Sequence, residues 1–247
     1  MNGENILKLS FRQINSNYVL LLVCLLVPLV STLSWNLSIA IDSKVTVFVI
    51  RLVKLCIVAY IHCGVLALFY QSLKGVEVNL KMLTSSANRY LKLYVAGLIG
   101  IGIFSVLFVS LFLFFVSRVE YGMTGYVFEP SRRYFVMIQA NMLITSVFTM
   151  YATAFVFTKN RGMSAVVDGI KYLLMNLKKS IPLLAFNLVG WIIVSAILFY
   201  AIQLPEGSKG YSCIVFLSRM LTCYITFTIY IGACFILMSE GARKTKI

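Results

Sequence analysis

The sequence contains few acidic residues and few prolines, and polar residues seldom interrupt its apolar runs. Of its 247 residues, 8 are Asp or Glu, 4 are Pro and 1 is His. A soluble helical core needs polar positions every three or four residues to form a solvent-facing side, and the apolar runs of this chain lack them. The hydrophobic share of 60% is above the average of about half that is usual in soluble proteins. These features exclude an ordinary soluble domain and indicate a membrane protein.

Motifs of the common enzyme classes and metal sites are also missing. The sequence has no HExxH, no GxSxG, no Walker motif and no pair of acidic residues within an apolar run. One His without an acidic partner cannot form a catalytic triad or a zinc site on its own. The six cysteines show no CxxC pair or Cys/His spacing, and nearly all lie in apolar runs as small hydrophobic residues. We therefore expect a protein that is not an enzyme and that uses no cofactor and no metal.

Six apolar runs of membrane-spanning length follow one another along the chain. A transmembrane helix needs about 20 residues. The first run has this length and no cleavage site follows it, so we expect it to remain as a helix rather than to be removed as a signal peptide. The predicted fold is all-α and polytopic, with residues 1–247 forming a single transmembrane domain. The six transmembrane helices are predicted at residues 18–40, 45–70, 93–116, 134–157, 181–202 and 211–238.

Basic amphipathic segments precede the first, third and fifth predicted crossings. In residues 163–200 the segment MSAVVDGIKYLLMNLKKS leads directly into the run IPLLAFNLVGWIIVSAILFY, and residues 5–39 and 78–116 have the same layout. The returning helices carry related triplets, His62-Cys63-Gly64, Tyr151-Ala152-Thr153 and Tyr230-Ile231-Gly232. This pattern predicts three repeats of an amphipathic interfacial helix followed by a two-helix hairpin.

Basic residues are shared unevenly between the two sides of the predicted membrane. The N-terminal segment, segments 71–92 and 158–180 and the C-terminal tail hold 14 Lys and Arg residues, against 8 on the other side. Cytoplasmic loops carry the excess of Lys and Arg, so both termini are predicted to be cytoplasmic. We interpret the net charge of +14 as a topology signal and as contact with anionic lipid. The sequence lacks the interleaved aromatic and basic residues that are typical of a nucleic-acid-binding surface, so we expect no binding to nucleic acid.

Four basic side chains fall within predicted crossings and are the candidate ligand-binding residues: Arg51, Lys54, His62 and Arg219. On one helix, Arg51 and His62 lie within about 20° of each other and Lys54 within about 60° of Arg51. Arg51, Lys54 and Arg219 share a similar depth, so they predict an outward cationic pocket for an anionic headgroup or substrate. One alternative is that the Lys and Arg side chains extend to the interface, and His62 could instead hydrogen-bond a neighbouring helix. A further alternative is that the basic side chains pair with one of four carboxylates, Asp42, Glu120, Glu129 and Glu206.

A resemblance to a known family lies at the junction of the second crossing and the second basic segment. There the residues ALFYQSLKGVEVNLKMLTSSANRYLKLYVAGL resemble the YesL-type (DUF624-like) bacterial membrane proteins. The later stretch SAVVDGIKYLLMNLKKSIPLLAFNL is similar to the repeated unit of related six-helix families of unknown function. The resemblance implies a six-helix protein of the bacterial inner (cytoplasmic) membrane that is often associated with transport systems. It supplies no functional residues.

Three functions stay open at this point. The first is a transport-associated or accessory membrane component that binds an anionic phospholipid or another anionic ligand. The second is the permease subunit of an ABC-2-type exporter, which would contact a separate cytoplasmic ATPase through segments 71–92 and 158–180. Such permeases resemble this chain in having six helices, an N-terminal interfacial helix and a coupling segment, which would be 71–92 here. The near-equal segment 158–180 and the very short turn at 204–210 count against this function. The third is a membrane scaffold.

Overall fold

The computed structural model describes residues 3–39, 41, 43–122, 130–201, 203–205 and 208–244. These residues form α-helices and no strand, which confirms the predicted all-α class. In chain order the helices are α1 (Gly3–Ser16), α2 (Tyr18–Ile39), α3 (Lys44–Leu73), α4 (Met82–Gly122), α5 (Pro130–Lys159), α6 (Ala165–Met175), α7 (Leu177–Ala201) and α8 (Lys209–Lys244).

Within the described residues, four helical stretches have the length and composition needed to cross a membrane. Their mean hydropathy lies between 1.9 and 2.3. Large apolar side chains such as Phe48, Val106 and Ile192 are exposed on their surfaces, as expected of helices that face lipid instead of water. The chain is therefore a multi-pass membrane protein by the length and composition of its helices. The stretches are Lys44–Leu73, Met82–Phe108, Leu177–Ala201 and Lys209–Ser239.

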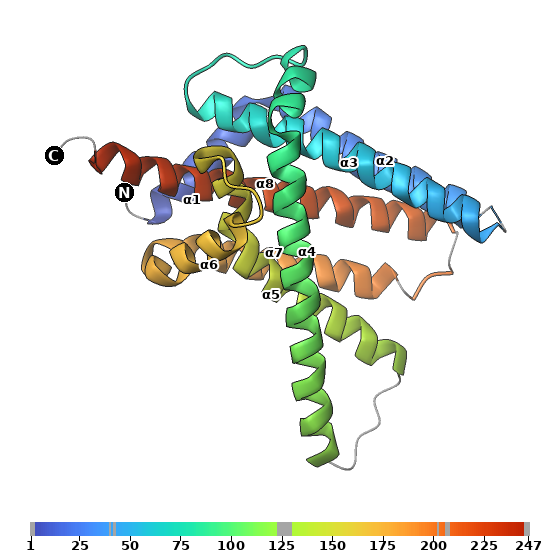
Figure 1. Ribbon diagram of the computed structural model, residues 1–247. Helices are drawn as coiled ribbons and strands as arrows, with labels where there is room; N and C mark the ends of the chain where they lie inside the picture. The colour runs from blue at the N-terminus through green and yellow to red at the C-terminus, as the bar shows by residue number, and fades with distance from the viewer. Residues whose placement is uncertain are drawn as a thin grey trace.

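Helix α8 forms the centre of the bundle (Figure 1). Within its most apolar 18-residue window 61% of the residues are buried, against 39% or less in the other three candidate spans. It packs against α7, α5, α1, α2 and α3. Helices α7 and α8 fit together because Gly190 of α7 leaves room for Ile225 of α8. A Cβ atom added at Gly190 would lie 2.6 Å from the side chain of Ile225. Gly232 of α8 likewise accepts Leu183, which would lie 2.5 Å from an added Cβ.

Helix α4 runs across the other long helices instead of beside them (Figure 1). Its first half is packed into the bundle through buried Ala87, Tyr90 and Tyr94, whereas Ile103 and Leu107 further along are exposed. Close approach to α5 depends on a small residue, since a Cβ atom at Gly97 would lie 2.9 Å from Val156. The second half of α4 and the start of α5 therefore extend away from the bundle that α7 and α8 form.

The basic segments that were predicted to be interfacial helices have three different structures. The first is α1, whose buried Ile6, Ser10 and Ile14 pack against α7 and α8, so that protein covers its apolar face. The third contains α6, a separate helix that lies between α5 and α7 in the sequence. The second contains no separate helix, because residues 74–81 are non-helical and α4 then continues for 41 residues. The stretch 82–122 contains no proline that would end the helix before the crossing.

The predicted helix bounds agree with the structure to within a few residues, apart from this fusion. Helices α2, α3, α5, α7 and α8 occupy the runs predicted at 18–40, 45–70, 134–157, 181–202 and 211–238, and α8 extends further, to Lys244. Helix α3 ends where Gly75 adopts a φ of +79°, a left-handed conformation that favours glycine. Between the third and fourth predicted crossings the sequence predicts a loop at 117–133, whereas residues 117–122 belong to α4 and residues 130–133 to α5. Residues 123–129 and the tip of the turn at 204–210 lie outside the described residues.

Candidate functional site

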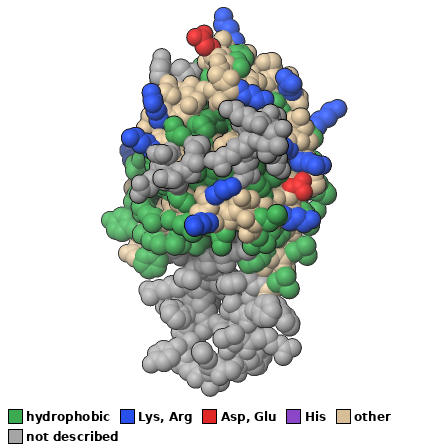
Figure 2. Space-filling view, turned by 90° about the vertical axis from the view of Figure 1, so that its left-hand side faces the viewer, with side chains coloured by type: hydrophobic (Ala, Val, Ile, Leu, Met, Phe, Trp, Pro, Cys, Tyr) green, Lys and Arg blue, Asp and Glu red, His purple; other side chains and the backbone are tan. Residues whose placement is uncertain are grey.

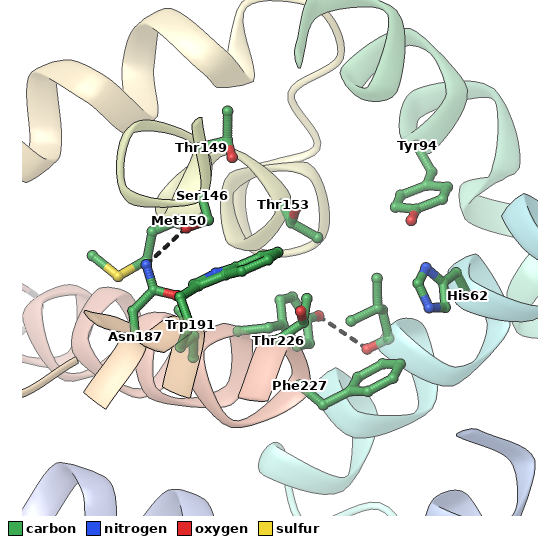
Figure 3. A pocket seen from close by; sticks show the side chains of 13 residues that line it. His62, Tyr94, Ser146, Thr149, Met150, Thr153, Asn187, Trp191, Thr226 and Phe227 are labelled. Carbon is green, nitrogen blue, oxygen red and sulfur yellow. Dashed lines mark hydrogen bonds between the residues drawn. The ribbon is translucent and has the colours of Figure 1, made fainter. Parts of the chain in front are cut away.

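Two cavities lie between the long helices, and each contains polar side chains from otherwise apolar runs. We call the first the central cavity, because five helices, α3, α4, α5, α7 and α8, contribute to its wall (Figure 3). Its volume is about 120 Å³. Its lining residues are His62, Leu66, Tyr94, Ser146, Thr149, Met150, Thr153, Asn187, Trp191, Thr226, Phe227, Ile229 and Tyr230.

Asn187 is the most buried polar side chain of the central cavity. It comes from the middle of α7 and is 1% exposed. Its Nδ2 atom donates a hydrogen bond of 2.8 Å to the hydroxyl of Ser146 on α5. Its Oδ1 atom is buried and has no hydrogen-bond partner within the described part of the chain. An acceptor of this kind is costly in a membrane interior, where no bulk water can satisfy it.

His62 brings a second unsatisfied atom to the same cavity. Its Nε2 atom is buried and lacks a partner among the residues that the structure describes. The ring is held by an edge-to-face contact with Phe227 of α8, with 5.4 Å between the ring centroids. Figure 3 shows His62 and Tyr94 on one side of the cavity and Asn187 with Ser146 on the other. Two residues that each carry a partnerless polar atom therefore line one cavity from opposite sides.

Several hydroxyl groups that line the central cavity donate to the backbone and therefore face the cavity as hydrogen-bond acceptors. Ser146, Thr149 and Thr226 each donate to a carbonyl of their own helix, at 2.6, 2.7 and 2.8 Å. Their protons are used, while lone pairs of their oxygens stay available. The hydroxyl of Tyr230 similarly donates to the carbonyl of Leu66 at 2.9 Å and links α8 to α3. These four hydroxyls can therefore act only as acceptors toward an occupant of the cavity.

The second cavity surrounds Arg219, and we call it the Arg219 cavity. It lies between α2, α7 and α8 and has a volume of about 440 Å³. Apolar side chains form most of its wall, and Ser31, Tyr211 and Thr222 add hydroxyl groups. No acidic residue lines it within the described chain. Its lining residues are Val27, Pro28, Ser31, Trp191, Val194, Leu198, Tyr211, Val215, Ser218, Arg219, Thr222 and Cys223.

The structure places the four residues singled out from the sequence in different surroundings. Arg219 lines the cavity named after it, and His62 lines the central cavity. Arg51 is exposed and Lys54 partly exposed on α3, and neither is among the lining residues of the Arg219 cavity. Helix α2 packs against both α3 and α8. The structure thus brings one of the three predicted outward cations into a cavity.

A basic surface lies at the end of the molecule that carries both termini. Figure 2 views this end and shows Lys and Arg side chains scattered among apolar ones. Here Lys159, Arg161 and Lys171 border a groove of about 420 Å³ with Asp168, whose carboxylate lies 3.4 Å from Nε of Arg161. On α6 the side chains of Val167, Leu174 and Met175 are exposed, Met175 to 84%.

Comparisons with known proteins add no identification. No protein-family model, no curated protein and no solved structure matches this chain. Within the described residues, no group of three or more His, Cys, Asp and Glu residues could hold a metal ion.

Sequence reasoning did not identify Asn187 or Ser146. It considered ionisable groups in apolar runs, whereas these two side chains are polar and uncharged. The signal was nevertheless present, because Asn187 stands within the run LLAFNLVGW, where an amide must find a hydrogen-bond partner inside the bundle.

Proposed function

We propose that this protein is a transport-associated or accessory component of a bacterial cytoplasmic membrane, and that it binds an anionic lipid or other anionic ligand in the Arg219 cavity. The observation that carries the proposal is the position of Arg219 in a cavity between α2, α7 and α8 whose wall is mainly apolar and carries hydroxyl groups from Ser31, Tyr211 and Thr222. A charge in such surroundings favours an anion, because electrostatic attraction is stronger where water is excluded.

The chemistry of the cavity suits a phospholipid. A guanidinium binds phosphate through two parallel hydrogen bonds, and the hydroxyls of Ser31 and Tyr211 supply further polar contacts. Val27, Val194 and Leu198 offer an apolar wall for an acyl chain. Arg51 and Lys54, on the exposed side of α3, would meet headgroups at the lipid surface instead of inside this cavity.

We further propose six membrane crossings with both termini in the cytoplasm. Helices α2 and α5 have 22 and 30 residues, enough to join the four spans described above, because about 20 residues cross a bilayer. Figure 1 shows the N- and C-terminal ends on the same side of the molecule, as an even number of crossings requires. The Lys and Arg residues at that end agree with a cytoplasmic location.

The exporter permease has less support than this accessory role. Such a permease would present a coupling helix in segment 71–92, and the described residues 74–81 are a non-helical connection that leads directly into α4. Segment 158–180 does contain a separate helix, α6, so a cytoplasmic ATPase or another transporter subunit would have to bind there. A scaffold role makes no use of either cavity.

Lipid retention after mild purification tests the proposal. Native mass spectrometry of protein purified from membranes that contain phosphatidylglycerol should show a bound anionic lipid in the wild type. Arg219→Gln should reduce this adduct roughly ten- to a hundredfold, because a hydrogen bond to a charged group contributes about 1.5–3 kcal/mol. The mass of the adduct distinguishes a lipid from a small anion.

Arg51→Gln is the matched control, since it removes the same charge from an exposed position on α3. It should leave the adduct unchanged. Loss of the adduct in both single variants would favour the converging cluster that the sequence predicts, and equal retention by wild type and Arg219→Gln would refute the site.

A further inference from the structure

The central cavity contains two polar atoms that the described protein leaves unsatisfied, Oδ1 of Asn187 and Nε2 of His62. They belong to α7 and α3, and the side chain of Asn187 is 1% exposed. Each costs free energy while it lacks a partner. An occupant that hydrogen-bonds to both would recover that energy, so the arrangement points to a ligand.

The size of the cavity limits this ligand. An engineered protein cavity of about 150 Å³ holds one benzene molecule, and the central cavity measures about 120 Å³. An occupant therefore has up to about six non-hydrogen atoms. This is far smaller than a phospholipid, so the Arg219 cavity and the central cavity select different molecules.

The charge of the wall limits the ligand further. None of the lining residues is Asp, Glu, Lys or Arg. A bare ion in this site would therefore lack a counter-charge, at a large cost in a medium of low dielectric. The hydroxyls of Ser146, Thr149 and Thr226 already donate to backbone carbonyls, so the ligand must supply donors to them and to Asn187. Trp191 and Phe227 offer flat apolar surfaces to the rest of it.

We propose that the central cavity binds a small uncharged solute that donates hydrogen bonds, such as a primary amide, with Asn187 and His62 as its polar contacts. Figure 3 shows the ring of Trp191 reaching into the space between these two residues. This inference is independent of the anion proposed for the Arg219 cavity, because the two ligands differ in both charge and size.

The position of Trp191 supplies a direct reporter. The sequence has two tryptophans, Trp35 and Trp191, so Trp35→Phe leaves one tryptophan, which lines the central cavity and also the Arg219 cavity. Acrylamide is an uncharged primary amide of five heavy atoms that quenches tryptophan. In the purified Trp35→Phe protein we expect quenching by acrylamide that saturates, in place of the linear dependence of random collision. Acetamide, which carries the same amide and does not quench, should compete, whereas iodide and caesium should give no saturation.

Variants locate the bound quencher. On the Trp35→Phe background, Asn187→Leu and His62→Phe should each raise the apparent dissociation constant for acrylamide roughly threefold or more, in line with the loss of one hydrogen bond. In protein freed of bound lipid, Arg219→Gln, a matched control in the Arg219 cavity, should leave this constant unchanged, and without added solute Asn187→Leu should leave lipid retention unchanged.

The proposal would be overturned if acrylamide quenches the Trp35→Phe protein linearly or if iodide or caesium quenches it saturably. It would also be overturned if saturation by acrylamide is lost only in Arg219→Gln. An unchanged apparent dissociation constant for acrylamide in both Asn187→Leu and His62→Phe would also overturn it. If Asn187→Leu does not fold, as judged by circular dichroism and gel filtration, His62→Phe decides.

Discussion

Individual glycines determine how closely the helices of this bundle pack. Gly169 of α6 lies against the backbone of α5, and a Cβ atom there would stand 2.8 Å from the backbone nitrogen of Ala152 and 3.1 Å from its Cα. Backbone atoms cannot rotate away as the end of a side chain can. Gly102 of α4 is also helical, yet an added Cβ would meet nothing within 4 Å. The two glycines therefore allow a matched comparison.

Gly169→Ala should destabilise the protein, because α6 must move away from α5, and overpacking costs about 1–3 kcal/mol. Gly102→Ala should be neutral or stabilising by up to about 1 kcal/mol, since alanine favours a helix. Thermal unfolding in detergent, followed by circular dichroism, measures both. Equal melting temperatures for Gly169→Ala and wild type would show that α6 is not held against α5 as described.

The candidate sites show how far residue-level prediction reached. His62 and Arg219, which line the two cavities, are conspicuous in the sequence because each is an ionisable group in an apolar run. The amide of Asn187 was overlooked because it carries no charge. The predicted cluster of three cations relied on a common depth along the helices, and depth does not reveal which helices are neighbours. In the structure α2 packs against both α3 and α8, an arrangement that helix periodicity alone does not contain.

Individual helices were predicted better than their ends and their packing. Long apolar runs gave the right places for the helices, four of which have the length and composition of membrane spans, since length and hydropathy are local properties. The fusion of the second basic segment with α4 was not foreseen, because an amphipathic stretch gives no sign of where a helix ends when proline is absent. The covered apolar face of α1 was also unexpected, since amphipathic helices bury that face in either lipid or protein.

Helix α6 gives a prediction at the scale of the element. Its exposed Val167, Leu174 and Met175 lie near Lys171 and Lys178, a combination typical of a helix at the surface of an anionic membrane. We expect a bimane label at Met175→Cys, in protein whose native cysteines are replaced, to shift to shorter wavelength in vesicles with phosphatidylglycerol. A label at Asn160→Cys, on the exposed connection before α6, serves as the control.

Lipid should change the Met175 label far more than the Asn160 label. If instead the emission of the Met175 label shifts to shorter wavelength only when a soluble protein is added, α6 is a docking site for a partner and not a membrane-surface helix.

The whole molecule is asymmetric in the arrangement of its basic residues and its termini. Both terminal ends and α6 lie together, and the connection between α2 and α3 lies at the opposite side (Figure 1). The six crossings proposed above would place both termini on one side of the membrane, and this count depends on α4 and α5 both spanning it. The crosswise course of α4 makes this pair the critical one.

Reporter fusions test the topology of the chain. Fusions after Lys44, Gly125 and Gly207 should all report the outer side, and a fusion at the C-terminus should report the cytoplasm. The Gly125 position, which lies outside the described residues, is the most informative, because a cytoplasmic signal there would mean that α4 and α5 do not cross the membrane as a pair.

Trp191 belongs to the walls of both cavities. A change in the rotamer of this one side chain therefore alters the space available in both at the same time. The two binding equilibria are then thermodynamically linked, and the factor by which an anion beside Arg219 changes the affinity for a solute at Asn187 equals the factor for the reverse effect. If the bound lipid holds the indole ring in one orientation, the lipid composition of the membrane controls the occupancy of the central cavity.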